Sequence, residues 1–501
     1  MSRETIGRCG YVLLTTGVLA VSALVLWSSL TRARLWEDEA FNLTVPVNLL
    51  AGLGYTSDGT LSGSLLTPFD PRISTGPVVL LPIAAILSTG IDPVIGGRLV
   101  PAAFYVGLLA ALWQLGRRVG GRWGAIAALA SPLAFDTSAL PSPIQGPTDI
   151  LGEIPAAALL AWGLVALRQR PWLAGLLVGF AIQAKYISLL AIPGFALALL
   201  LAPRTSSWPA RLRSLGIAAL WVAAPTIVVE VVTATSLGFR GYLDHLRATW
   251  HFLRTGGQYN VDTSFAEKIA TLASSWYLPP MTVAVIVLTL VVLGIWAAGI
   301  AARHPTVLAR IATTESAPRR DDVRQILIVS AGGMLMFTGW WAMALHTPPW
   351  IRHPAPGIVA FVPVLVAFSV LAARILRSFA HLARRGWVWR IGSALNVLVL
   401  ALALVLTNLA AVESAWVRPA SELAKQREDA LAVGDIHEHW IATEWGPLIG
   451  VVVLAGAHVA QTDAPPENII GYPRLLNADD SEVCDDSLVT TPRVALCAAP
   501  R

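Results

Sequence analysis

Three acidic residues, Glu37, Asp38 and Glu39, follow closely behind the first apolar segment of the chain. Carboxylates are costly to hold beside membrane hydrocarbon unless they face an aqueous cavity or a ligand. The position of the cluster therefore predicts a functional site. The alternative is that these acids only favour the start of a helix, through the helix dipole.

A second acidic position is the segment Gly152-Glu153-Ile154-Pro155, with Asp149 shortly before it. If a helix begins before Asp149, the two carboxylates are one turn apart and share a face. They are then candidates for binding an acceptor or a metal ion. The alternative interpretation is that both residues simply start a helix.

Two cationic segments lie further along the chain, at Lys185-Tyr186 and at Arg352-His353. Lysine is rare in this sequence, so a lysine between two apolar spans indicates a specific need for an ammonium group, although it could also extend to the membrane interface. The planar guanidinium of Arg352 can bind two phosphate oxygens at once. The alternative is an arginine that flanks a span.

The composition excludes an ordinary soluble globular protein. Of the 501 residues, 55% are hydrophobic and only 13% are charged, against a charged fraction of about 25% in soluble domains. The net charge of +5 comes from small arginine clusters between apolar segments, which is the pattern of membrane topology signals and not of nucleic-acid binding. We predict an all-α polytopic membrane protein.

Eleven apolar segments are candidates for spans of about 20 residues. They cover residues 11–30, 99–115, 123–135, 154–167, 172–184, 187–202, 215–237, 278–301, 326–345, 357–376 and 391–411. The short apolar run 78–87 is predicted to lie at the interface, because only then do all large arginine clusters share the cytoplasmic side with the N-terminus. The candidate site residues and the tail then share the outer face.

The composition changes after the last apolar segment, so residues 1–412 are predicted to form the membrane domain, with residues 31–98 as its first outer loop, and residues 413–501 a small α+β tail. Residues 421–433 predict an exposed helix and the β-branched run 448–454 a buried strand. No Cys-x-x-Cys pair is present, which argues against a zinc site. If the tail is exported, Cys484 and Cys497 can form a disulfide.

The first outer loop resembles that of the GT-C glycosyltransferases, in particular the protein mannosyltransferases and lipid A aminoarabinose transferases. The resemblance rests on Asp38-Glu39 before a helix at 40–50, a Gly-x-Gly-Tyr-like turn at 52–55, and Gly76-Pro77 before a second interfacial helix. Glu153-x-Pro and Lys185-Tyr186 follow in the family's order. Glu153 stands where an aspartate is more usual, and His353 where a tyrosine is.

The resemblance implies a GT-C fold and transfer of one sugar from a polyprenyl phosphate carrier to a lipid, glycan or protein acceptor, with inversion at the anomeric carbon. It implies Asp38 as the general base with Glu39 bracing the catalytic loop. It places Lys185 and Tyr186, and Arg352 and His353, at the donor phosphate. Glu153 and Asp149 would contact the acceptor or a divalent metal ion, and the location would be the bacterial inner membrane, facing the periplasm.

Two alternatives remain open from the sequence. One is an oligosaccharide or protein glycosyltransferase of the same fold that uses a larger lipid-linked donor. The other is a non-enzymatic transporter or flippase, although transporters often show two related halves and the candidate charges here gather mostly in the first half of the chain.

Overall fold

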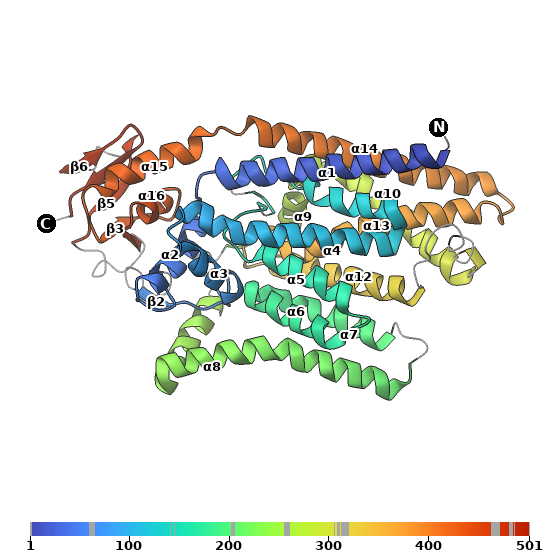
Figure 1. The fold of residues 1–501 in the computed structure, drawn as a ribbon, viewed down its shortest axis with the longest axis horizontal. Helices are drawn as coiled ribbons and strands as arrows, with labels where there is room; N and C mark the ends of the chain where they lie inside the picture. Colours follow the sequence, from blue (N-terminus) through green and yellow to red (C-terminus); the bar gives the residue numbers. More distant parts are fainter. Residues whose placement is uncertain are drawn as a thin grey trace.

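The computed structural model describes residues 3–59, 66–140, 142–144, 146–201, 206–254, 261–304, 306–307, 311, 320–461, 471–479, 484 and 486–499. Most of these residues are helical, and the long helices lie lengthwise beside one another (Figure 1). The N-terminus lies at one end of this bundle, and the C-terminal tail lies at the other.

Seven helical segments among the described residues are long and apolar enough to cross a membrane, which makes the chain a multi-pass membrane protein. They lie in α1 (Arg3–Thr31), α4 (Pro93–Ala130), α8 (Trp208–Arg254), α10 (Pro280–Arg303), α12 (Arg320–Met343), α13 (Ala355–Phe379) and α14 (Gly386–Val417). Four shorter apolar helices accompany them: α3 (Pro77–Leu87), α5 (Glu153–Ala166), α6 (Pro171–Ala184) and the segment of η2 (Tyr186–Ala191) and α7 (Ile192–Leu201).

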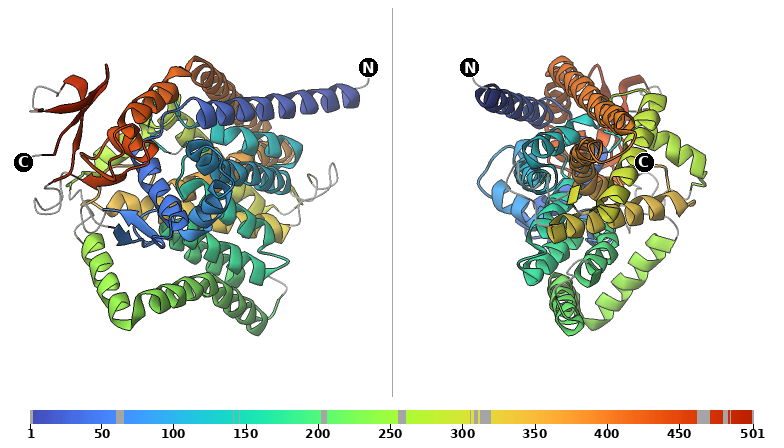
Figure 2. Two further views of the ribbon diagram at one scale, coloured as in Figure 1. Left: turned by 60° about the vertical axis from the view of Figure 1, so that its left-hand side comes forward. Right: turned by 90° about the vertical axis from the view of Figure 1, so that its right-hand side faces the viewer.

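Helix α4 is a hairpin of the two helices that the sequence predicts at 99–115 and 123–135. The chain reverses at Gly121, whose φ of 69° suits glycine because it has no side chain to clash. A Cβ placed on Gly116 would lie 2.8 Å from the Cβ of Ala128, a separation that a straight helix could never bring about. The same device bends α8 at Gly238, after which the helix takes a new direction (Figure 2).

Helix α13 lies at the centre of the bundle and contacts α4, α5, α10, α12 and α14. Its side chains are buried on nearly all sides, as expected for a helix that is apolar all round. By contrast, α8, α10 and α14 expose large aliphatic side chains such as Val231, Leu288 and Leu409. A membrane would cover these surfaces.

One lysine is fully buried at the outer end of α12. The ammonium of Lys268, on α9 (Phe265–Ser274), donates hydrogen bonds to the carbonyls of Trp341 at 2.8 Å and Ala344 at 2.5 Å and to the Thr347 hydroxyl at 3.1 Å. It therefore adds a partner to carbonyls at the C-terminal end of α12, where Ala344 also accepts from the amide and the hydroxyl of Thr347.

The first outer loop lies at the same end of the bundle as the tail (Figure 1). It consists of α2 (Glu37–Leu50), the antiparallel strands β1 (Thr56–Asp58) and β2 (Leu66–Pro68), and α3. Both helices occupy the places expected for them, and α3 begins with Pro77 in its first turn, where proline is well tolerated.

The tail contains α15 (Ser421–Gly434), α16 (Leu448–Leu454) and a five-stranded sheet. The strands, in their order across the sheet, are β4 (His458–Gln461), β3 (Trp440–Thr443), β5 (Arg474–Asn477), β7 (Val494–Cys497) and β6 (Ser487–Thr490). β3 is parallel to its two neighbours, and the other pairings are antiparallel. Cys484 and Cys497 are joined by a disulfide.

The predicted strand at 448–454 is wrong, because this segment is the helix α16. The helix begins directly after Pro447 and packs Ile449, Val451 and Val452 into the core, close to α2 and α15. Tertiary packing has overridden the strand preference of a β-branched run, which is a weak preference in any context.

A histidine and an aspartate hold the tail against the first outer loop. Nδ1 of His458 lies 3.1 Å from Oδ1 of Asp58, and the amide of Val459 donates to Oδ2 of Asp58 at 3.0 Å. The hydrogen bond to Asp58 raises the pKa of His458 despite the opposing effect of burial. The protonated imidazole is therefore the form that stabilises this contact.

This contact predicts a stability that depends on pH. It should be fully present below the pKa of an unfolded histidine, about 6.5, and be lost as the pH rises through the raised pKa of folded His458. We expect a loss of at most about 1 kcal/mol, as for other partly exposed pairs, in denaturant unfolding of the purified protein. His458→Gln should remove this pH dependence, whereas His439→Gln, at an exposed position nearby, should keep it. An unchanged slope in His458→Gln would contradict the assignment.

Candidate active site

Asp38 lies in the first turn of α2 and faces a cation from a distant part of the chain. Its carboxylate forms an ion pair with Arg352, which lies just before α13. The guanidinium of Arg352 also stacks over the ring of Trp350 at 4.1 Å and lies 5.7 Å from the ring of Trp36. Two aromatic faces and a carboxylate thus fix where this arginine points.

A second ion pair joins Lys185 to Glu153. The ammonium lies 2.8 Å from Oε1 of Glu153, a carboxylate that is fully buried at the start of α5. Lys185 itself ends α6 in an extended conformation, with φ −148° and ψ 114°. The lysine side chain can therefore point across the ends of the short helices instead of continuing along α6.

The backbone around Lys185 is held by two glycines. The amide of Gly76 donates to the carbonyl of Ala184 at 3.0 Å. A Cβ on Gly76 would lie 1.9 Å from the carbonyl oxygen of Gln183, and a Cβ on Gly152 would lie 1.9 Å from that of Ala184. Because only glycine permits these approaches, both glycines are needed to bring the first loop and α5 against Lys185.

The two ion pairs form one charged cluster. Burial raises the pKa of Asp38 above its usual range, and the positive charges of Arg352 and Lys185 oppose that increase. Glu37 and Glu153 add to it. Since Lys185 and Glu153 both act on the Asp38 carboxylate, residues from four distant segments lie within electrostatic reach of one another. The arrangement contains a general-base candidate beside two cations.

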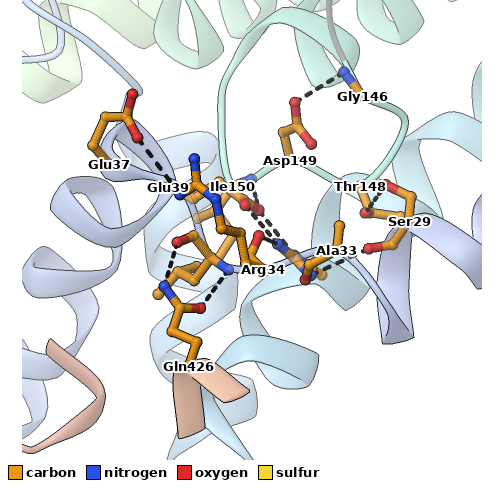
Figure 3. Close-up of polar contacts among 12 residues, drawn as sticks. Ser29, Ala33, Arg34, Glu37, Glu39, Gly146, Thr148, Asp149, Ile150 and Gln426 are labelled. Carbon is orange, nitrogen blue, oxygen red and sulfur yellow. Dashed lines mark hydrogen bonds and ion pairs between the residues drawn. The ribbon is translucent and has the colours of Figure 1, made fainter. Parts of the chain in front are cut away.

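Glu39, although adjacent to Asp38, faces a different partner (Figure 3). Its two carboxylate oxygens accept from Nε of Arg98 at 2.9 Å and Nη2 of Arg98 at 2.6 Å, and Oε1 also accepts from the amide of Ile150 at 3.1 Å. Arg98 donates further to carbonyls at the end of α1, including Ala33 at 2.8 Å. The geometry is that of a buried bidentate pair that ties α1, α2 and α4 together.

Asp149 lies near this buried pair. It accepts a hydrogen bond from the amide of Gly146 at 2.8 Å (Figure 3). Burial and the neighbouring charge of Glu39 raise the pKa of Asp149 to about 7. Asp149 and Glu153 thus have different partners. They do not share one helix face, as their spacing allowed, because α5 begins only at Glu153.

His353 is buried beside Arg352 and packs edge-on against Trp350, with ring centres 5.9 Å apart. Burial, with help from the charges of Arg352 and Lys185, lowers the pKa of His353 to about 3. The imidazole is therefore neutral at physiological pH, so it contributes a polar group and not a charge to the charged cluster.

An apolar groove of about 410 Å³ is lined in part by Tyr186, the neighbour of Lys185. It is lined by α6, α7 and the first part of α8, with residues such as Val178, Phe195 and Val222. Thr226 is a polar residue in this lining. The groove could therefore hold an apolar chain beside the charged cluster.

Sequence reasoning missed a polar network that joins the first loop to α8. Arg72 forms ion pairs with Asp70, at 2.6 Å, and with Glu230. Asp70 also bonds to Nε2 of His245 at 2.8 Å, and Tyr242 donates to Glu230 at 2.6 Å. Burial alone would raise the pKa of Asp70, but the bond to His245 and the charge of Arg72 lower it.

A signal for this network was present in the spacing. Tyr242, His245 and Thr249 recur at intervals of three and four residues, which places them on one face of a helix, and Thr249 also donates to Asp70. Glu230 was a signal of another kind, because a carboxylate inside an apolar span is costly unless it has a partner.

The described residues contain no group of three or more His, Cys, Asp or Glu side chains placed to hold a metal ion. Asp38 and Glu153, the carboxylates of the charged cluster, are each paired with a cation. These residues do not fit a metal site in this arrangement, and we derive no step through a metal.

The architecture matches solved membrane-enzyme structures over nearly the whole chain. The apo structure of ArnT from Cupriavidus metallidurans has a TM-score of 0.60 at 11% identity, covering 99% of this chain and 100% of that one. ArnT from the same organism bound to undecaprenyl phosphate has a TM-score of 0.57 at 13% identity, with 98% and 99% coverage. No family model and no curated protein matches the sequence.

These matches define the class of fold. The expected GT-C fold is confirmed as an architecture that the chain shares with ArnT. Within that class, the chain is similar in fold to ArnT along its full length, including the tail.

The contacts of Gly152 predict that a single methyl group at this position will disturb the backbone beside Lys185. Gly152→Ala should force apart α5 and the backbone at Ala184, at a cost of at least about 1–3 kcal/mol for overpacking. Thermal unfolding of the purified protein would measure the loss. Gly299→Ala is the matched control, because a Cβ there meets no heavy atom within 4 Å. Equal stability of the two variants would show that the close approach is not required.

The buried pair of Glu39 and Arg98 predicts a larger effect. Glu39→Gln keeps the shape of the side chain but leaves the guanidinium buried without its counter-charge, and we expect a loss of about 3–5 kcal/mol in denaturant unfolding. Arg427→Gln, which breaks a half-exposed pair with Asp92, should cost less than about 1 kcal/mol. A small loss in Glu39→Gln would mean that the pair does not brace the loop.

Proposed function

We propose that the chain is an integral-membrane glycosyltransferase that transfers a sugar from a polyprenyl-phosphate donor to a hydroxyl acceptor. The observation that carries the proposal is the cluster of Asp38 with Arg352 and Lys185, whose neighbour Tyr186 lines an apolar groove. The fold shared with ArnT supports it, since one of those structures is bound to undecaprenyl phosphate.

The groove suits the carrier lipid of such a donor. Its lining is almost entirely apolar and includes Tyr186, so a polyprenyl chain would lie in the groove while its phosphate reaches Lys185. The guanidinium of Arg352 would bind the same phosphate. Cations at this place stabilise the charge that develops on a leaving phosphate.

The ion pairs then act as resting partners of the catalytic groups. When the donor phosphate takes over Arg352 and Lys185, Asp38 loses the positive charges that lower its pKa. The freed carboxylate becomes a stronger base and accepts the proton of the acceptor hydroxyl. The acceptor oxygen bonds to the anomeric carbon from the opposite side as the bond from that carbon to the phosphate oxygen breaks, which inverts the configuration.

The remaining site residues have supporting roles in this proposal. Glu153 holds Lys185 in place and, as the sequence predicts, would contact the acceptor, and neutral His353 would lie beside the phosphate. Glu39 braces the first loop through Arg98, with Asp149 next to it. We place the enzyme in the bacterial inner membrane with about eleven membrane-crossing helices, the N-terminus in the cytoplasm and the tail, a domain of residues 413–501, outside.

A transferase predicts that Asp38→Asn will abolish transfer while leaving the fold intact. The expected loss of rate is about 10²–10⁴-fold, the usual contribution of a general base. Mass spectrometry of envelope glycans and lipid-linked sugars, in cells that carry only the variant, would show the product missing and the donor accumulated. Glu37→Gln, on the same helical turn, is the matched control and should keep the product.

The same measurement separates the alternatives. A transferred group with the mass of several sugars would indicate a larger lipid-linked donor in the same fold. An unchanged glycan profile in Asp38→Asn would contradict the enzymatic proposal, and movement of a lipid-linked sugar across the membrane without transfer would support a flippase.

A further inference from the structure

A second pocket, of about 630 Å³, lies where the bundle meets the tail. It is bounded by the end of α14, by α15 and α16, and by the segment that leads from α1 into α2. Its apolar lining includes Leu140, Val417, Leu448 and Val451. Its cationic lining residues are Arg34, Arg418, Lys425 and Arg493.

The pocket has an excess of positive charge. Two acids, Glu422 and Asp429, face four cations in its lining. Asp429 is already neutralised by Arg493, with Nε of the arginine 2.7 Å from Oδ2. Lys425 is exposed and, within the described part of the chain, its ammonium has no ion-pair partner.

One arginine of the pocket, Arg34, is only weakly satisfied. Nη1 of Arg34 is buried and lies 3.8 Å from Oε2 of Glu37, beyond hydrogen-bonding distance; the two side chains are seen together in Figure 3. Arg418 donates to the carbonyl of Thr137, and its charge also acts on the carboxylate of Asp149. A buried donor without an acceptor is costly, so an anionic ligand would relieve the cost.

The pocket lies at the level where the apolar helices end. Trp416, at the end of α14, is 70% exposed, and Trp27, near the end of α1, is 45% exposed. The guanidinium of Arg32 stacks on Trp27 at 4.3 Å. Exposed tryptophans beside arginines mark the interface between hydrocarbon and headgroups. The cations of the pocket are therefore at headgroup height.

We propose that this pocket binds the phosphate-bearing headgroup of an anionic membrane lipid. Arg34, Arg418 and Lys425 bind the phosphate through charge-assisted hydrogen bonds, and the acyl chains follow the exposed apolar surface of α14 into the membrane. The site is separate from the donor groove between α6, α7 and α8, so the proposal does not depend on the transfer reaction.

A lipid here would also connect the tail to the candidate active site. Gln426 of α15 bonds to both the amide and the carbonyl of Leu35, each at 2.7 Å. Arg34 lies directly before Leu35, and α2 begins at Glu37, two residues after Leu35. The bound headgroup thus joins α15 to the segment that positions Asp38.

Native mass spectrometry of the full-length protein in detergent can test the proposal, with phosphatidylglycerol and phosphatidylcholine as lipid probes. Wild-type protein should bind phosphatidylglycerol more tightly than phosphatidylcholine. Lys425→Glu, at an exposed position that leaves the fold intact, should weaken phosphatidylglycerol binding about tenfold, as for the loss of one charge-assisted contact. Arg34→Gln should act in the same direction.

Arg240→Glu is the matched control, with the same change of charge at an exposed position on α8 outside the pocket, and it should bind the lipid like wild type. Equal binding in wild type and Lys425→Glu would overturn the site. Equal binding of the two lipids, or complete displacement of the lipid by inorganic phosphate at similar concentration, would overturn the assignment to an anionic lipid. Because the readout is binding, loss of sugar transfer alone would leave this result unchanged.

Discussion

The arrangement depends on a requirement that charges drawn into an apolar bundle be paired. Asp38 and Arg352 are 314 residues apart in sequence, yet each is the other's ion-pair partner. Breaking the fully buried pair of Glu39 and Arg98 would leave a charge uncompensated, at a cost of several kcal/mol. The pairs of Asp38 and of Lys185 keep part of their surface exposed and cost less to break. Asp38 with Arg352, Glu39 with Arg98 and Glu153 with Lys185 together hold α2, α4, α5 and the start of α13 in one geometry.

The adjacent acidic residues Asp38 and Glu39 differ in role because they have different partners. Glu39 and Asp38 are adjacent in α2, but one is fully buried against Arg98 and the other keeps part of its surface open. A helix turns by about 100° at each residue, so adjacent side chains must face different surroundings. Because Glu39 is held by Arg98, the helix keeps its position while the carboxylate of Asp38 can change its partner.

Much of this arrangement follows from the sequence, because its strongest signals are local. Long apolar runs, and arginines between them, were enough to gather Asp38, Glu153, Lys185 and Arg352 at one end of the bundle. The pairing of those charges was not predictable, since it depends on how short helices pack. Arg98 gave no signal because it resembles a residue at the edge of a span, and residues 448–454 were misassigned because their burial depends on α2 and α15.

The turn at Lys185 illustrates how glycine and lysine act together. The glycines of two separate segments bring backbone against backbone there, so little room remains around the residue that follows Ala184. An ammonium on a flexible stem can reach a carboxylate in such a place, whereas the guanidinium needs space for a planar fork.

The buried Lys268 extends that comparison to a site without chemistry. Three oxygens surround its ammonium in a compact shell, which matches the three protons of a primary amine. The equally buried Arg98 instead meets the two oxygens of one carboxylate with its planar fork. The arrangement of the acceptors, and not merely their charge, thus distinguishes the enclosed position of Lys268 from that of Arg98.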